Sequence, residues 1–192
     1  MKSFAPMLAM AFAMFPFFAS AQGGETFDQA GERCRALSDK ADREACITKF
    51  ATTNWIVTRQ IDKLDGSKTI AMMIFSPDEV PTNRTLRHPS LSIRCLKNRT
   101  ELHIGWPDFL GLQAVSVKWR LDDQPVVTER WNASGSGDGA FTNNPVDLSK
   151  KMLGKKEFVI SVAPYNKVAS TVTFNLAGLE EAIKPLREVC KW

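Results

Sequence analysis

Between Trp55 and Phe174, apolar residues recur at every second position in a series of short segments, and this period of two constrains the fold more than any other feature of the chain. It is the period of a β-strand that buries one face. The segments with this pattern are residues 55–61, 91–95, 102–106, 115–121, 127–131, 158–162 and 168–174. With the return strand at 68–75, they predict about eight short strands.

Short polar turns between these segments predict antiparallel hairpins. Asp65-Gly66 separates residues 55–61 from 68–75, and the run 70–75 is apolar on both faces, which favours a place inside a sheet. Lys97-Asn98-Arg99 joins 91–95 to 102–106, and residues 122–125 join 115–121 to 127–131. The segment 76–89 is long enough to be a functional or mobile loop.

Helices are expected at both ends of the strand-rich region. Residues 26–50 show helical spacing, with a break and a cap at Ser38-Asp39. Residues 179–190 form an amphipathic pattern in which Pro185 bends the helix or begins a new turn. We therefore predict one mainly β, or α+β, antiparallel β-sandwich-like domain at 53–192. A helical hairpin at 22–52 precedes it, and a C-terminal helix closes it.

Residues 1–21 have the organisation of a secretory signal peptide. Lys2 supplies positive charge, residues 4–19 are apolar, and Ala19-Ser20-Ala21 is the small-residue pattern that signal peptidase cleaves. The apolar run is shorter than the roughly 20 residues that cross a bilayer. We expect cleavage, no stable membrane span afterwards, and a periplasmic or secreted protein.

Four cysteines in an exported chain indicate disulfides, and four allow three pairings. We favour Cys34–Cys46, which closes a short loop between the two predicted helices, and Cys95–Cys190, which ties a central strand to the last helix. A zinc site is not favoured, because no C-x-x-C pair is present and both histidines are far from any cysteine in sequence. No other cofactor is expected.

Several function classes lack the residues that they need. The net charge of the chain is +4, and its basic residues are scattered, so a nucleic-acid groove is not expected. The Gly-rich segment 134–139 does not open a helix, so it is interpreted as a flexible link and not as a phosphate-binding loop. A hydrolase would have to use Glu101, His103 or the region of Asp122, which no catalytic pattern connects. We predict that the protein is not an enzyme.

Arginine and tryptophan residues of the two central hairpins form the candidate binding face. If the hairpins pair, Arg94 and Arg120 lie in a row on the outward side, and arginine recognises carboxylates and phosphates through two parallel hydrogen bonds. The complete set is Arg94, Arg120, Arg130, Trp106 and Trp131. The alternative is a solvated arginine face with the tryptophans in the core.

Five motifs together resemble a known family. They are Cys34-x-Ala36-Leu37-x-Asp39 with residues 42–46, the turn 65–69 after Trp55, the hairpin 93–106, and the segments 120–131 and 174–190. In this order they are similar to the VasI-like family of exported proteobacterial proteins associated with type VI secretion. The resemblance covers nearly the whole chain after residue 21, and it carries no catalytic residues.

These features predict an exported periplasmic accessory or interaction protein with a protein partner in the cell envelope. The resemblance implies an association with type VI secretion. An exported inhibitor or ligand-binding module, acting on an envelope hydrolase or polymer, is the alternative.

Overall fold

The computed structural model describes residues 27–82 and 85–192. The predicted signal peptide at 1–21 lies outside the described residues. Within them, no helix is both long and apolar enough to cross a membrane.

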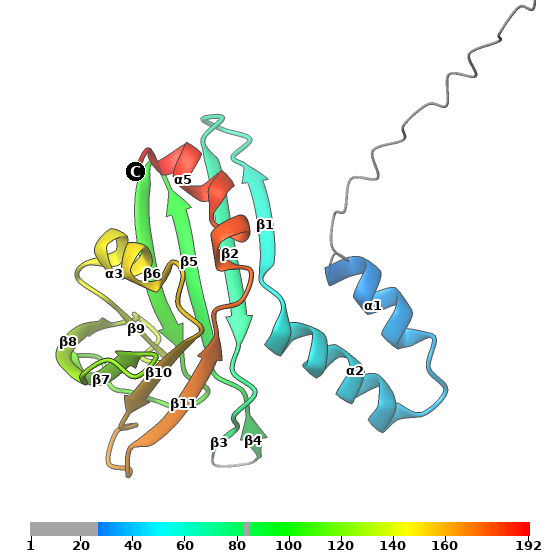
Figure 1. Cartoon of the computed structure of the whole chain (residues 1–192), viewed down its shortest axis with the longest axis horizontal. Coiled ribbons are helices and arrows are strands. Elements are labelled where there is room, and N and C mark those ends of the chain that lie inside the picture. Colours follow the sequence, from blue (N-terminus) through cyan, green and yellow to red (C-terminus); the bar gives the residue numbers. More distant parts are fainter. Residues whose placement is uncertain (1–26, 83–84) are drawn as a thin grey trace, which may run out of the picture.

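A helical hairpin precedes the sheet, as the sequence predicts. Helix α1 (Phe27–Arg35) and helix α2 (Lys40–Thr53) are joined by the Cys34–Cys46 disulfide. The side chain of Asp39 caps α2, because its Oδ1 accepts hydrogen bonds from the backbone N–H groups of Ala41 and Asp42 at 2.7 and 3.1 Å. Figure 1 shows the hairpin projecting from one side of the sheet, which α2 approaches with its C-terminal end.

Nine strands form one antiparallel sheet in the order β1-β2-β5-β6-β9-β8-β7-β10-β11. A separate pair, β3 (Val80–Pro81) and β4 (Leu86–Arg87), lies within the predicted loop 76–89. The strands of the sheet are β1 (Ile56–Ile61), β2 (Lys68–Phe75), β5 (Ser90–Leu96), β6 (Arg99–Gly105), β7 (Val115–Leu121), β8 (Val127–Ala133), β9 (Gly139–Phe141), β10 (Glu157–Val162) and β11 (Ser170–Asn175). The eight predicted strands are confirmed, and β3, β4 and β9 are additional.

The turn between β5 and β6 shows why this sequence makes hairpins. Lys97 and Asn98 have φ values of +49° and +58°, the pair of left-handed conformations found in a two-residue type I′ turn. That turn matches the twist of the strands and sets the register Ile93↔Leu102 and Arg94↔Glu101. Apolar residues therefore share one face of the hairpin and charged residues the other.

The sheet curls so that β10 and β11 lie over the inner face of β2 and β5 (Figure 1). The edge of β11 is tied to the segment after β2: the Ser76 hydroxyl donates to the Thr173 carbonyl, and the Thr173 N–H donates to Asp78 Oδ2, each at 2.7 Å. The result is sandwich-like although the nine strands are one sheet. This agrees with the predicted fold class.

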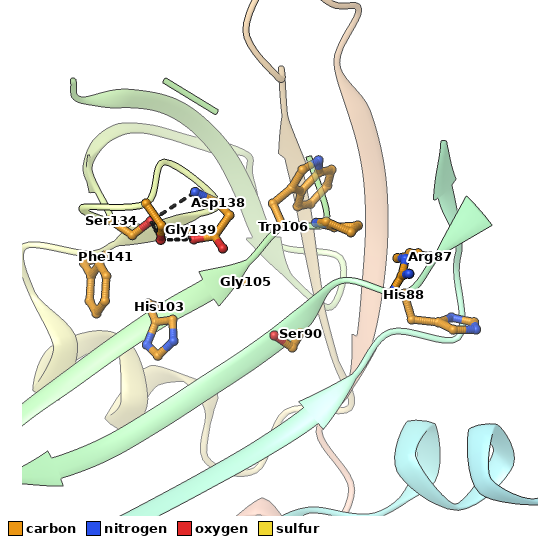
Figure 2. Close-up of a pocket in the computed structure, with 12 residues that line it drawn as sticks. Arg87, His88, Ser90, His103, Gly105, Trp106, Ser134, Asp138, Gly139 and Phe141 are labelled. Atoms are coloured by element: carbon orange, nitrogen blue, oxygen red, sulfur yellow. Dashed lines mark hydrogen bonds between the residues drawn. The ribbon is translucent and has the colours of Figure 1, made fainter. Parts of the chain in front are cut away.

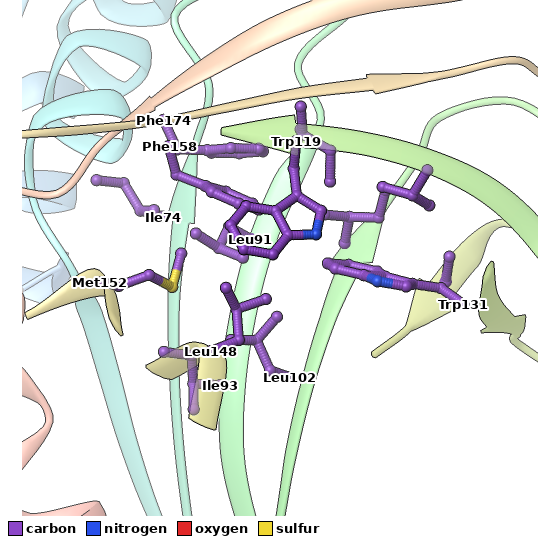
Figure 3. Close-up of a cluster of buried hydrophobic side chains, with 14 of the residues drawn as sticks. Ile74, Leu91, Ile93, Leu102, Trp119, Trp131, Leu148, Met152, Phe158 and Phe174 are labelled. Carbon is purple, nitrogen blue, oxygen red and sulfur yellow. The ribbon is translucent and has the colours of Figure 1, made fainter. Parts of the chain in front are cut away.

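Helices α3 (Pro145–Met152), α4 (Leu179–Ala182) and α5 (Lys184–Cys190) complete the inner side. Their buried side chains join those of the strands in one core, seen in part in Figure 3, where Trp131, Phe158, Leu102 and Met152 converge. Pro185 stands in the first turn of α5, so the last helix restarts there. The predicted Cys95–Cys190 disulfide joins α5 to β5 and is present.

Candidate functional site

The three arginines of the predicted binding face are not brought together. Strand β9 lies between β6 and β8, so the two hairpins do not pair directly. Each arginine instead has a partner of its own. Arg94 Nε donates to Glu101 Oε2 at 2.7 Å, Arg120 Nη2 lies 3.3 Å from Glu157 Oε1, and Arg130 Nη2 donates to the Ala114 carbonyl at 2.9 Å. An arginine row across two paired hairpins is not found.

The two tryptophans of that set lie in the core. Trp106 is 2% exposed and Trp131 is 0% exposed. Trp131 satisfies its indole N–H by donating to Glu129 Oε2 at 2.9 Å. Both belong to the packed core, which agrees with the alternative, although Trp106 also contributes to the lining of a pocket described below.

Two of the three acidic and basic groups named for a hydrolase have structural partners. Glu101 is held by Arg94 and by Arg99, at 2.7 and 3.1 Å. Partial burial acts to raise the pKa of Glu101, but the hydrogen bonds from both guanidinium groups bring it below its usual value. Asp122 accepts hydrogen bonds from the backbone N–H groups of Lys156 and Glu157, at 2.9 and 3.0 Å, so it joins the β7–β8 turn to the start of β10.

His103, the third, lines a pocket on the outer face of the sheet, which we name the outer-face pocket. Its volume is about 460 Å³. It lies over the ends of β5, β6 and β9 (Figure 2). The β6 residues that line it, His103 and Gly105, alternate with buried residues and so lie on the face of the strand away from the core. Its lining residues are Arg87, His88, Ser90, His103, Gly105, Trp106, Pro107, Ser134, Ser136, Asp138, Gly139 and Phe141.

The floor of the pocket is made of two glycines and a serine. Ser90, Gly105 and Gly139 are cross-strand neighbours on β5, β6 and β9. A Cβ on Gly105 would lie 2.5 Å from Ser90 Oγ, and one on Gly139 would lie 2.9 Å from the Ile104 carbonyl oxygen. Neither glycine can gain a side chain without displacing its neighbour, so the depth of the pocket follows directly from these residues.

One side wall is an aromatic pair. The rings of His103 and Phe141, cross-strand partners on β6 and β9, stack with centroids 4.5 Å apart. Burial, and secondly the positive charge of Arg94, lower the pKa of His103 to about 4. The imidazole is therefore neutral at pH 7, and its buried Nδ1 has no hydrogen-bond partner among the described residues.

A second wall is the segment from Ser134 to Asp138, which forms a fixed turn. Ser134 Oγ donates to Asp138 Oδ1 at 3.0 Å, and the Ser136 hydroxyl donates to the same oxygen. The Ser136 hydrogen bond is the largest contribution that lowers the pKa of Asp138. Backbone hydrogen bonds from Trp106 N–H to the Asp138 carbonyl and from Leu110 N–H to the Gly137 carbonyl attach the turn to the loop after β6. The predicted flexible link is thus an ordered pocket wall.

The opposite end of the pocket is formed by Arg87 and His88, which lead from β4 into β5. The Arg87 side chain is exposed and has no ion-pair partner among the described residues. His88 Nε2 lies 3.5 Å from a carboxylate oxygen of Glu79, outside the pocket, and its buried Nδ1 has no partner within residues 27–82 and 85–192. Within the same ranges, no three His, Cys, Asp or Glu side chains converge to hold a metal ion.

Large apolar side chains are exposed on two loops beside this pocket, residues 106–114 and 163–169, which we name the apolar loop pair. Its exposed residues are Phe109, Leu112, Tyr165 and Val168. The loops are joined by a hydrogen bond from Tyr165 N–H to the Phe109 carbonyl at 2.8 Å and by the ion pair Lys167–Asp108 at 2.6 Å. The rings of Phe109 and Tyr165 meet in a T-shaped arrangement across the two loops, with centroids 6.0 Å apart. Exposed apolar side chains gathered on joined loops make this region a candidate interaction surface.

The comparisons with known proteins place this fold in a family. Residues 58–192 match the model of the family described as "Type VI secretion system VasI, EvfG, VC_A0118". The chain belongs to the VasI family. The family match begins within β1, so the helical hairpin α1–α2 precedes the matched region. A search of the curated proteins finds no match.

Among solved structures, the VasI-family chain is similar to the crystal structure of invasion-associated protein B from Bartonella henselae. The two share 11% sequence identity with a TM-score of 0.50, over 74% of this chain and 98% of that chain. At this identity the likeness is one of fold.

Sequence reasoning missed the outer-face pocket because its walls come from three separate segments of the chain, residues 87–90, 103–107 and 134–141. One signal was available: in Ser134-x-Ser136-x-Asp138 three polar side chains alternate with glycines. Short polar side chains at this spacing readily hydrogen-bond one another in a turn.

Proposed function

We propose that this VasI-family protein is an exported accessory component of type VI secretion, that it acts by binding a protein partner in the cell envelope, and that it has no catalytic role. The observation that carries the interaction role is the apolar loop pair: Leu112 is 68% and Val168 88% exposed on two loops that are tied together. Membership of the VasI family supplies the link to type VI secretion.

The cysteines support export. Both pairs are disulfide-bonded, and structural disulfides persist in oxidising compartments such as the periplasm. The Cys95–Cys190 bridge ties the last helix, α5, to β5. This supports a location outside the cytoplasm.

The use made of the ionisable side chains supports a role without catalysis. Glu101 and Asp122 are engaged in ion pairs or backbone hydrogen bonds that stabilise the hairpins. The hydroxyls of Ser134 and Ser136 donate to Asp138, and neither is hydrogen-bonded to a histidine as an activated nucleophile would be.

Affinity capture with matched variants tests this proposal. The disulfide-bonded protein is used as bait in an envelope extract of cells that assemble a type VI apparatus, beside the variants Leu112→Ser with Val168→Ser, and Leu64→Ser. Leu64 is 98% exposed in the β1–β2 turn, away from the apolar loop pair, so it controls for the loss of an exposed apolar residue. We expect one component of the apparatus to be retained by wild type and by Leu64→Ser and lost by the double variant.

Loss of the partner from both variants, or retention by both, would remove the apolar loop pair as the interface. Enrichment of envelope proteins unrelated to type VI secretion would contradict the proposed pathway.

A second candidate, an exported ligand-binding module, is favoured by the outer-face pocket. Its volume lies in the range of small-molecule sites, and polar groups line it at both ends.

A further inference from the structure

We propose that the outer-face pocket binds a small zwitterionic ligand of the amino acid or short peptide class, with its ammonium group at Asp138 and its carboxylate at Arg87. This proposal concerns a different surface from the apolar loop pair and does not depend on the protein partner proposed above.

The Asp138 wall presents hydrogen-bond acceptors. Both serine hydroxyls use their single proton on Asp138 Oδ1, and the Asp138 N–H donates to Ser134 Oγ. What these side chains offer a ligand is Asp138 Oδ2, which accepts no hydrogen bond within the described ranges, and the remaining lone pairs of the hydroxyls. A ligand group that meets this wall must therefore be a donor, and a cationic ammonium is the best match for a carboxylate.

The Asp138 carboxylate is also held in place before any ligand arrives. Two hydroxyls fix one oxygen, and the turn that carries the residue is attached by backbone hydrogen bonds to the loop after β6. A fixed acceptor reduces the entropy lost when a ligand binds.

The other end of the pocket has the opposite character. The Arg87 guanidinium carries donors and no acceptor, and no carboxylate neutralises it in the described part of the chain. Figure 2 shows Asp138 and Arg87 at opposite ends of the pocket, with Gly105 and Ser90 between them. A guanidinium recognises a carboxylate through two parallel hydrogen bonds.

The middle of the pocket suits a compact, uncharged section of ligand. The floor of Ser90, Gly105 and Gly139 leaves room for backbone atoms, and the His103–Phe141 pair provides a flat wall with a neutral imidazole. The ligand that fits has a charged donor at one end, a charged acceptor at the other and a short section between them. Amino acids and short peptides have this structure. A neutral sugar could hydrogen-bond to both groups but would neutralise neither charge.

Titration with a set of related dipeptides tests the proposal. The protein is isotope-labelled, with both disulfides intact, and titrated with L-alanyl-L-alanine, its N-acetyl form, its C-terminal amide and, as the neutral sugar, chitobiose. Affinity is measured by calorimetry and the site by amide chemical shifts. We expect L-alanyl-L-alanine to bind with shifts at Asp138, His103 and Phe141. Removing either charge should weaken binding by about tenfold or more, the range for a lost charge-assisted hydrogen bond.

Variants on the protein side make the assignment of charges specific. Asp138→Asn should weaken binding of the dipeptide by a similar factor. It should have little effect on binding of the N-acetyl form, because the acetylation and the substitution both remove the same contact between the ammonium group and Asp138. Likewise, Arg87→Gln should weaken binding of the dipeptide but have little effect on binding of its C-terminal amide, which lacks the carboxylate. The matched control is Asp65→Asn, since Asp65 also accepts a hydrogen bond from a nearby serine residue but lies in the β1–β2 turn.

The proposal is overturned if L-alanyl-L-alanine does not bind at millimolar concentration, if the N-acetyl form or amide binds equally well, or if chitobiose binds more tightly in the same pocket. Where Asp138→Asn does not fold, the dipeptide series on wild type still decides the question. None of these outcomes affects capture of a protein partner through Leu112 and Val168.

Discussion

The two disulfides are predicted to contribute very differently to the stability of the sheet. Cys95–Cys190 joins residues 95 apart and ties α5 to β5, whereas Cys34–Cys46 joins residues 12 apart within the helical hairpin. From loop-closure entropy alone, the first constrains the unfolded chain by about 4.7 kcal/mol and the second by about 2.9 kcal/mol. Only the first loop includes strands of the sheet, from β5 to β11.

The stabilisation that Cys34–Cys46 gives should moreover be confined to the helical hairpin. Helix α1 packs on α2, and α2 meets the sheet through its buried C-terminal residues Phe50 and Ala51. We therefore expect Cys95→Ala with Cys190→Ala to lower the free energy of unfolding of the sheet by about 3–5 kcal/mol. Cys34→Ala with Cys46→Ala should change that value by less than about 1 kcal/mol, with the loss appearing as faster amide exchange in α1 and α2.

Guanidinium unfolding of the two double variants and the wild type, followed by near-ultraviolet circular dichroism from the core tryptophans, measures these values. Equal losses of free energy in the two variants would refute the reasoning, and so would a larger loss on removing Cys34–Cys46. Either result would mean that the hairpin and the sheet unfold as one cooperative unit.

Three further predictions concern the core, a turn and a titrating group. Trp131→Ala should cost about 3–5 kcal/mol of stability in chemical unfolding, because the ring is fully buried. Arg130→Ala, on the exposed side of the same strand, should cost only about 1 kcal/mol, the contribution of its hydrogen bond to the Ala114 carbonyl. Gly137→Ala should lower Tm more than Gly66→Ala: both have φ near +70°, but a Cβ at 137 would lie 2.3 Å from an aromatic carbon and one at 66 would meet nothing within 4 Å. His103 should titrate near pH 4 by NMR. Because its pKa is lower in the folded than in the unfolded protein, the free energy of unfolding should fall as the pH is lowered from 6.5 to about 4. That fall should be smaller in His103→Gln. A midpoint near 6.5 would contradict the burial of this imidazole.

Most of the fold could be predicted from the sequence because seven of the eight predicted strands bury one face. The exception is β1, whose residues are all half-buried or exposed. Apolar and polar residues alternate in segments such as 91–95 and 115–121 because one face of each strand is buried. The additional strands are too short to show this alternation, since β3 and β4 have two residues each and β9 has three, one of them a glycine. A strand of that length forms because neighbouring strands hydrogen-bond to it, and its own sequence shows no period of two.

The missed strand β9 explains why the predicted binding face differs from the structure. Direct pairing of the two central hairpins would have aligned Arg94 with Arg120, but β9 enters between them. The same strand brings Gly139 and Phe141 beside Gly105 and His103, which creates the outer-face pocket. Sequence patterns report the face of each strand, whereas the order of the strands is set by packing between distant segments.

Photo-crosslinking in living cells is the most direct test of the central claim that this protein binds a type VI secretion component in the envelope. A photoreactive amino acid is placed at Leu112, Val168 or, as the control, Leu64, all of which are exposed. We expect one crosslinked type VI component from positions 112 and 168, formed outside the cytoplasm, and none from position 64. Equal crosslinking from all three positions, or none from 112 and 168 in cells that assemble the apparatus, would contradict it.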